Sequence, residues 1–179
     1  MDIYDANRKA WNHEADKRNF WTIAVSEDRI ESARQGNPEI WVTPFKNVPF
    51  DWISGLKNRD VLVACGGGGQ QTPVLAAFGC RTTSLDISEN QIAQDRTTLE
   101  RFGLKADTVC ANILEMPFPD SCFDAVIMPQ AMNFIDDIEK LYFGIHRILR
   151  NGGTFIFGTA NPILYTFDEK IQERRLKMK

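Results

Sequence analysis

The stretch that most constrains the fold is residues 61–71, which read VLVACGGGGQQ. Its first residues form a short, β-branched apolar run, which is typical of a buried parallel strand. Four consecutive glycines follow, and residues 70–78 then favour a helix that Gly79 would end. Glycine allows positive φ and lets a ligand lie directly against the backbone. The stretch therefore predicts a strand–turn–helix unit that binds a nucleotide, with a tight structural turn as the alternative.

The spacing of the glycines bears on which nucleotide is bound. A dinucleotide-binding turn reads G-x-G-x-x-G or G-x-G-x-x-A, and its last small residue allows close packing of the helix on the strand. Counted from Gly66, that last position is Gln71, and counted from Gly67 it is Thr72. Neither residue fits, so the turn disfavours a nicotinamide cofactor.

The turn instead resembles motif I of the class I, Rossmann-like S-adenosylmethionine-dependent methyltransferases, which reads roughly acidic-x-G-x-G-x-G. In this register Cys65 stands at the first glycine position and Val63 at the acidic position, and both are departures from the family. The resemblance implies that the turn binds S-adenosylmethionine through Ala64, Cys65, Gly66, Gly67 and Gly69.

Asp86 ends the next predicted strand, residues 81–85, at the edge where open α/β sheets bind ligands. A carboxylate there can accept hydrogen bonds from both hydroxyls of a ribose. The same arrangement serves NAD sites, so Asp86 supports adenosine binding in general. Ile87 would pack on the adenine face. The alternative is an aspartate that only opens the helix after Ser88, which has Gln91 three residues on in a capping-box pattern.

Residues 111–128, ANILEMPFPDSCFDAVIM, resemble the family segment G-D-A-x-x-L-P-F-P-D-x-S-F-D-x-V almost position for position. Asn112 stands where the family commonly has aspartate, and its side-chain oxygen could accept from the adenine amine. Ile113 would offer its backbone amide to the ring. Residues 149–159, LRNGGTFIFGT, resemble the family's L-K-P-G-G-x-hydrophobic strand entry, with Asn151 in place of proline. The resemblance covers about residues 60–159, with several motifs in the correct order.

The methyl end of the cofactor is predicted to lie after the strand at residues 123–128. Met128 and Asn133 are assigned to the cofactor and Gln130 to the acceptor, although Asn133 or Gln130 could hydrogen-bond either the methionine moiety or the acceptor. Trp11 and Trp21 could close over the cofactor or the acceptor and are assigned to the acceptor, with packing of the lid against the core as the alternative. No catalytic base is assigned, because His13 and His146 are both typical of surface histidines. Methyl transfer to an acceptor that is already nucleophilic requires none, since the enzyme can act by holding the reactants together and excluding water.

Strands at residues 61–64, 81–85, 108–110, 123–128 and 154–158 alternate with helices, which predicts a parallel α/β sheet. The resemblance implies a three-layer, Rossmann-like sheet with strand order 3-2-1-4-5. Before it, helices over residues 6–20 and after Ser26 predict a helical lid, and the proline-rich residues 37–50 should be extended or irregular. We expect residues 1–56 to form this lid and residues 57–179 the cofactor-binding core.

The family sheet normally has two further strands, six and seven, and the sequence contains neither after residue 158. Only one more helix is predicted, opened by Thr166 with Glu169 in a capping-box pattern. The fifth strand would then be an apolar edge with unpaired backbone groups. Three arrangements would account for this: a truncated or short family member, a homodimer paired along the edge, or coverage by the final segment IQERRLKMK.

Composition narrows the partners and the location. The net charge of −3 gives no broad basic surface, which argues against nucleic acid. No apolar run approaches the ~20 residues of a membrane span, and the polar N-terminus is unlike a secretory signal. The four cysteines lack C-x-x-C spacing, which disfavours a metal site and favours reduced thiols. We therefore expect a cytoplasmic protein with a small-molecule substrate.

Together these features predict S-adenosylmethionine-dependent methyl transfer by in-line displacement. Two alternatives stay open at this point. The absent strands are compatible with a non-catalytic module that binds S-adenosylmethionine. A nicotinamide-dependent oxidoreductase is the other, and both its glycine spacing and the lack of a Tyr-x-x-x-Lys pair speak against it. The methyl acceptor cannot be read from the sequence.

Overall fold

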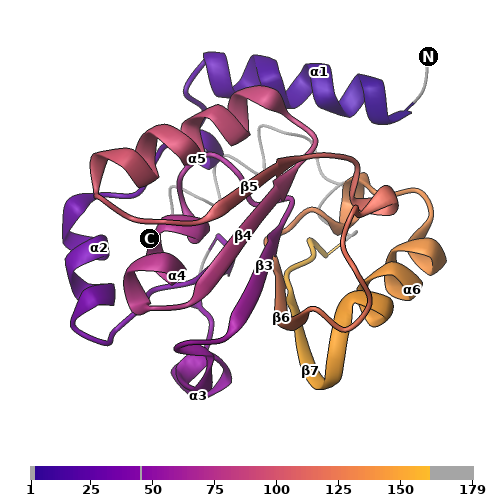
Figure 1. The fold of residues 1–179 in the computed structure, drawn as a ribbon. Coiled ribbons are helices and arrows are strands. Elements are labelled where there is room, and N and C mark those ends of the chain that lie inside the picture. Colours follow the sequence, from indigo (N-terminus) through magenta and orange to yellow (C-terminus); the bar gives the residue numbers. More distant parts are fainter. Residues whose placement is uncertain (1–2, 45, 162–179) are drawn as a thin grey trace.

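The computed structural model describes residues 3–44 and 46–161, which form an α/β fold around a five-stranded sheet. All five strands are parallel, in the order β5-β4-β3-β6-β7 (Figure 1). Counted from the strand that precedes the glycine turn, this is the predicted order 3-2-1-4-5. The strands are β3 Asp60–Ala64, β4 Arg81–Asp86, β5 Asp107–Cys110, β6 Phe123–Met128 and β7 Leu149–Phe157.

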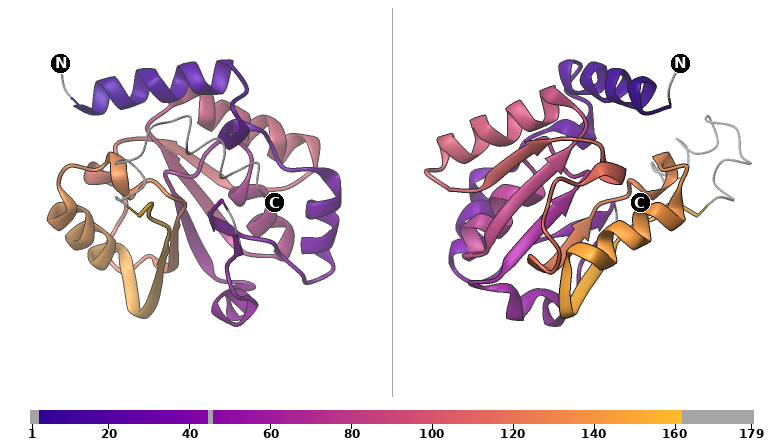
Figure 2. Two further views of the ribbon diagram at one scale, coloured as in Figure 1. Left: turned by 180° about the vertical axis from the view of Figure 1, so that it is seen from behind. Right: turned by 45° about the vertical axis from the view of Figure 1, so that its right-hand side comes forward.

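Helices cover both faces of the sheet, with α4 and α5 on one face and α6 on the other (Figures 1 and 2). Within the described residues, no helix has the length and apolar character needed to cross a membrane. The α-helices are α1 Ile3–Asp16, α2 Glu27–Arg34, α3 Phe50–Ile53, α4 Gln71–Phe78, α5 Glu89–Arg101 and α6 Ile138–Ile148. Short 3₁₀ helices span Phe20–Thr22, Ser54–Leu56, Ile113–Glu115 and Met132–Phe134.

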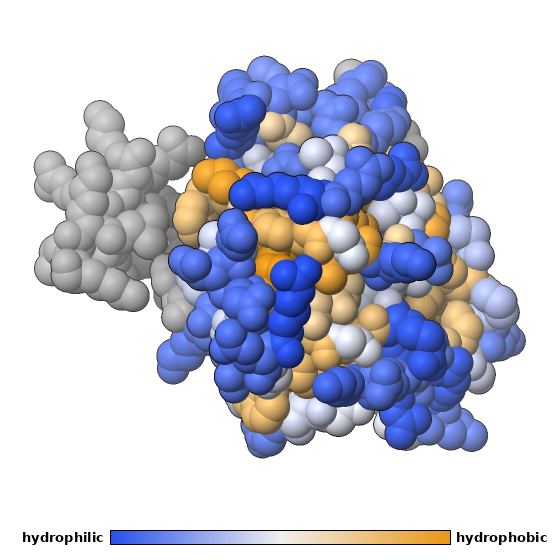
Figure 3. Space-filling model, turned by 60° about the vertical axis from the view of Figure 1, so that its left-hand side comes forward, coloured by the Kyte–Doolittle hydropathy of each residue, from blue (hydrophilic) through white to orange (hydrophobic). Residues whose placement is uncertain are grey.

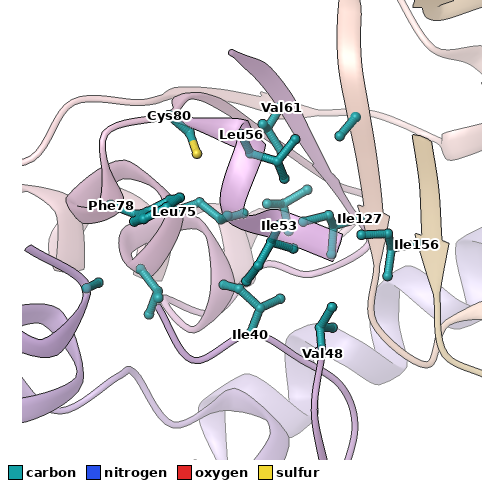
Figure 4. Close-up of a cluster of buried hydrophobic side chains, with 14 of the residues drawn as sticks. Ile40, Val48, Ile53, Leu56, Val61, Leu75, Phe78, Cys80, Ile127 and Ile156 are labelled. Carbon is teal, nitrogen blue, oxygen red and sulfur yellow. The ribbon is translucent and has the colours of Figure 1, made fainter. Parts of the chain in front are cut away.

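The central strand β3 is buried on both faces. Val61 and Val63 belong to a hydrophobic cluster with α2, α3 and α4 (Figure 4), whereas Leu62 and Ala64 belong to a second cluster with α6. All four side chains are 0% exposed. A strand covered by helices on both sides must be apolar at successive positions, which is why residues 61–64 read as a continuous run.

The N-terminal residues pack onto this core and also reach across it. The predicted helix at residues 6–20 is α1, which ends at Asp16 because Arg18 adopts a φ of 52° and interrupts the helical backbone. α1 lies beside α5 at the carboxyl end of the sheet (Figure 1). The proline-rich stretch forms a small antiparallel hairpin of β1 Trp41–Thr43 and β2 Lys46–Asn47, a detail that the sequence did not predict.

Two further predictions change in detail. The fifth strand starts at Leu149, well before the expected residue 154, because Leu149 already pairs with Phe123 across a bulge. Ser88 caps α5 by accepting from the Gln91 N–H, but the Gln91 side-chain oxygen makes no return bond to any described group. The helix predicted from Thr166 and the segment IQERRLKMK lie outside the described residues. Pairing of two chains along β7 stays a prediction.

Gly158 marks the point where β7 meets the β1–β2 hairpin. A Cβ atom there would lie 2.6 Å from the carbonyl carbon of Val42, and the Val42 oxygen accepts from Gln130 N at 3.1 Å. Because backbone must move to make room, Gly158→Ala should lower the free energy of unfolding by about 1–3 kcal/mol, measured by urea denaturation. Gly55→Ala is the control, since a Cβ there meets no described atom within 4 Å. Equal losses in the two variants would contradict this account.

Candidate functional site

A pocket of about 500 Å³ lies at the carboxyl ends of the strands. Its walls include the turn after β3, the end of β4 and the loops after β5 and β6. This is the edge at which open α/β sheets bind ligands, and the volume is within the range of small-molecule sites. The N-terminal segment supplies the remaining wall, through residues of α1, α2, β1 and the stretch between the first two helices.

The glycine turn leaves bare backbone on the pocket wall. Gly66 and Gly67 both line the pocket. A Cβ on Gly66 would lie 2.7 Å from Val63 Cγ1 and 3.1 Å from the Pro129 ring, and a Cβ on Gly67 would lie 2.8 Å from Gln91 Cβ. Side chains at these two positions would therefore collide with the packed surroundings. The packing around the turn is therefore sufficient to require glycine at both positions.

Asp86 is held in place beside this turn. Its Oδ2 accepts from Gly67 N at 3.2 Å and its Oδ1 accepts from Ser88 N at 2.9 Å. The residue is 8% exposed and lines the pocket. Burial raises the pKa of the Asp86 carboxyl, while the N–H groups of Ser88 and Gly67 act in the opposite direction. The Ile87 N–H also lowers the pKa of Asp86, so three backbone N–H groups hold the carboxylate in place at the pocket wall.

A second buried carboxylate, Asp95 on α5, supports the turn from behind. Asp95 Oδ1 accepts from Gly69 N at 2.6 Å and Oδ2 accepts from Ser84 Oγ at 2.5 Å. Burial raises the pKa of Asp95 to about 7. Sequence reasoning missed this residue. Its spacing from Ile92 and Leu99, which are both buried on the same helix, was the available signal that an acid faces the core.

The residues predicted to surround the adenine also line the pocket, namely Ile87, Asn112 and Ile113. Asn112 also caps the 3₁₀ helix that follows it, because its side-chain oxygen accepts from Leu114 N at 3.0 Å. One lone pair of that oxygen is thus already used, and the other is available to a ligand.

Three predicted cofactor contacts lie off the pocket wall: Ala64, Gly69 and Met128. Ala64 and Met128 are 0% exposed and belong to the hydrophobic cluster on the α6 side. The Gly69 N–H is bonded to Asp95, and its carbonyl oxygen accepts from Val25 N at 2.8 Å. These three residues shape the turn and its support, and they do not face the pocket.

Aromatic side chains form a large part of the pocket wall. Trp11 and Trp21, both predicted to contact the acceptor, line the pocket together with Gln130 and Asn133. Trp11 packs edge-on against Phe134, with ring centroids 5.6 Å apart. Trp41 on β1 also lines the pocket, which the sequence did not predict. Figure 3 turns the α2 side of the molecule forward, and apolar side chains gather there between hydrophilic margins.

Hydrogen bonds hold α1 over the site. Ser88 Oγ donates to Asn12 Oδ1 at 2.6 Å, and Glu89 accepts from Asn12 and Arg8. At the other end of the helix, Asn7 Nδ2 donates to the Phe134 carbonyl oxygen at 3.0 Å. The helix therefore bridges the loops that follow β4 and β6, and this bridge holds Trp11 at the pocket wall.

The pocket offers little for acid–base catalysis. His13 and His146 are exposed on α1 and α6, away from the pocket. Burial raises the pKa of the Cys65 thiol, which keeps it protonated. Of the described residues that line the pocket, Asp86 is the only one with a carboxylate. Among the described residues, the pocket therefore presents groups that can bind and orient ligands, with Asp86 as its one carboxylate and with no histidine.

Comparison with known proteins is consistent with this geometry. Residues 61–157 match the family model of the methyltransferase domain. A Bacillus subtilis protein, the uncharacterized methyltransferase YbaJ, is 41% identical over 94% of this chain, which spans 66% of that protein. The sterol 24-C-methyltransferase ERG6B of Gibberella zeae is 32% identical over 69% of this chain, and the match covers 33% of that enzyme. The chain thus spans less than two thirds of each of these two relatives.

Solved structures share the fold. A proposed S-adenosylmethionine-dependent methyltransferase of Methanococcus maripaludis aligns with 99% of this chain and 73% of its own, with a TM-score of 0.60 at 15% identity. The phosphoethanolamine N-methyltransferase 1 of Haemonchus contortus, solved with S-adenosylhomocysteine, aligns with 83% of this chain and 30% of its own, with a TM-score of 0.57 at 20% identity. At such identities the likeness concerns the fold.

Proposed function

The chain belongs to the methyltransferase-domain family, and from this premise we propose that it transfers a methyl group from S-adenosylmethionine to a small-molecule acceptor. S-adenosylmethionine is the cofactor of this family. The observation that carries the proposal is the single continuous pocket that joins the glycine turn and Asp86 to an aromatic chamber. Cofactor and acceptor would meet in that pocket.

The described residues fit the proposed cofactor. Asp86 offers two oriented carboxylate oxygens to ribose hydroxyls, and Ile87 offers an apolar side chain to a base. Gly66 and Gly67 allow close approach of a ligand to the backbone. When bound, S-adenosylmethionine would supply a methyl group on a positively charged sulfur, which an acceptor lone pair attacks in line.

The role of the protein in this reaction is to hold the two reactants in alignment and to exclude water from them. Trp11, Trp21 and Phe134 would exclude water from the acceptor side. Holding the reacting atoms about 3 Å apart in alignment supplies much of the acceleration in such reactions. Because the described pocket has no carboxylate except Asp86 and no histidine, we propose an acceptor atom with a free lone pair at neutral pH.

Isothermal titration of the full chain with S-adenosylhomocysteine tests cofactor binding. We expect saturable binding to one site, because the pocket presents one carboxylate for ribose. The absence of heat at high micromolar ligand would contradict the proposal. A parallel fluorescence titration with NADH should show no saturable change, and tight NADH binding would favour the oxidoreductase alternative. Formation of S-adenosylhomocysteine with a panel of acceptors would then separate an enzyme from a binding module.

A further inference from the structure

A cation and an indole N–H lie together on the pocket wall, and no predicted contact accounts for them. Arg29 on α2 and Trp41 on β1 both line the pocket. Arg29 Cζ lies 5.3 Å from the centroid of the Trp41 ring, within the range of a cation–π contact. Of the pocket-lining side chains that the structure describes, only Arg29 and Asp86 carry a formal charge.

The charge of Arg29 is incompletely compensated. Its Nη2 donates to the Glu39 carbonyl oxygen at 2.6 Å, and its Nε lies 3.5 Å from Glu39 Oε2, which is long for a hydrogen bond. Nε is buried without a hydrogen-bond partner in the described part of the chain. Burial lowers the pKa of Arg29 despite the neighbouring Glu39. A partly desolvated guanidinium with unmade bonds is costly unless an anion completes it.

Neighbouring polar atoms on the same wall are also unsatisfied. The Trp41 indole Nε1 is buried and donates to no group among residues 3–44 and 46–161. An indole N–H is a donor only, so it needs an acceptor from elsewhere. The Gln130 side-chain Oε1 is likewise buried and unpaired there. A side-chain amide can present either its oxygen or its nitrogen to a ligand.

Hydrogen bonds of the β1 backbone fix where Arg29 and Trp41 lie along the pocket. Trp41 N donates to Gln71 Oε1 at 3.0 Å, at the start of α4, and the Val42 oxygen accepts from Gln130 N after β6. Arg29 and Trp41 therefore lie toward the β6 side of the glycine turn. Ile87, Asn112 and Ile113 follow β4 and β5, on the other side of that turn.

We propose that Arg29 and Trp41 bind a carboxylate at the end of the pocket opposite the adenine. The proposal rests on the proposed function and extends it to the chemistry of one ligand group. One guanidinium and one indole N–H match a single negative charge with two acceptor oxygens. Two ligands could carry such a group, the amino-acid end of the cofactor and an acidic acceptor, and the experiment separates them.

The test compares three probes on the native chain and on Arg29→Gln by isothermal titration. S-adenosylhomocysteine carries the amino-acid carboxylate, and 5′-methylthioadenosine is a thioether of the same nucleoside that lacks this carboxylate. Indole-3-acetate carries a carboxylate on an apolar ring and has no nucleoside. If the cofactor supplies the carboxylate, Arg29→Gln lowers the affinity for S-adenosylhomocysteine about 10-fold or more. The affinity of the variant for methylthioadenosine then stays within about 2-fold of the native value. If the acceptor supplies it, indole-3-acetate binding alone is weakened by that factor.

Two results would overturn the proposal. One is an unchanged affinity of Arg29→Gln for all three probes, and the other is equal weakening of methylthioadenosine, which would indicate a structural role. Trp41→Phe should weaken binding of the same probe as Arg29→Gln, by about 3-fold or more, because it removes the N–H donor while keeping an aromatic ring at this position. Arg34→Gln on the same helix, outside the pocket, is the matched control. Failure of the native chain to bind either nucleoside would count against the proposed function, whereas indole-3-acetate binding still tests the carboxylate site.

Discussion

Replacing Asp86 with alanine is expected to reduce the affinity for S-adenosylhomocysteine by about 100-fold or more. A hydrogen bond to a charged group contributes about 1.5–3 kcal/mol, and this carboxylate lines the pocket, where we propose that it accepts from two ribose hydroxyls. Two such bonds exceed the ~2.7 kcal/mol that corresponds to 100-fold. Isothermal titration of the native and variant chains measures the change directly.

The controls for Asp86 separate ligand contact from turn geometry. The alanine variant also leaves Gly67 N and Ser88 N without their acceptor, so its thermal unfolding has to be recorded. Asp86→Asn keeps one acceptor oxygen but removes the charge, and it should lose an intermediate amount of affinity. Asp107→Ala, an exposed site at the start of β5, should bind as the native chain does. An unchanged affinity in a folded Asp86→Ala variant would refute the assigned role.

Asp95→Asn is expected to remove a large part of the pH dependence of stability. Burial raises the pKa of Asp95 from its usual 3.8 to about 7 in the folded chain, so the folded state holds the proton more tightly than the unfolded state. The resulting stabilisation is full below about pH 4 and is lost as the pH rises through about 7. Since one pKa unit corresponds to about 1.4 kcal/mol, the native chain should gain on the order of 3 kcal/mol from this group between pH 8 and pH 5.

Urea denaturation at pH 5 and pH 8 measures this effect. Asparagine can still accept from Gly69 N and can donate to Ser84 Oγ, so the turn keeps its support while the charge is gone. The pKa of Asp86 is raised in the same direction, and the Asp86 charge also raises the pKa of Asp95. The difference between the two chains therefore measures the Asp95 group together with its coupling to Asp86. Asp107→Asn provides the control for a surface charge. The same pH dependence in native and Asp95→Asn chains would contradict this account.

The fold was predictable where the signal is local in the sequence. The β-branched run before the glycines, the Ser88 cap and Gly79 each act within one element, and the structure confirms the strand order and both helix limits. Gly79 adopts a φ of 99°, which only a glycine accepts readily, so the end of α4 was fixed by residue type. The start of β7 was missed because pairing with β6, rather than composition, extends it to Leu149.

For the candidate site, too, some residues could be predicted from local sequence and others could not. The sequence by itself determined the glycine turn and Asp86, because bare backbone and a carboxylate at the ends of successive strands are typical of a nucleoside site. Only the tertiary structure decided that Asp95 supports the turn and that Arg29 and Trp41 meet beside it, since these contacts join α5, α2 and a hairpin that no local pattern connects. The physical reason is burial: a charge acquires its role when packing removes it from water, and packing depends on segments distant in the chain.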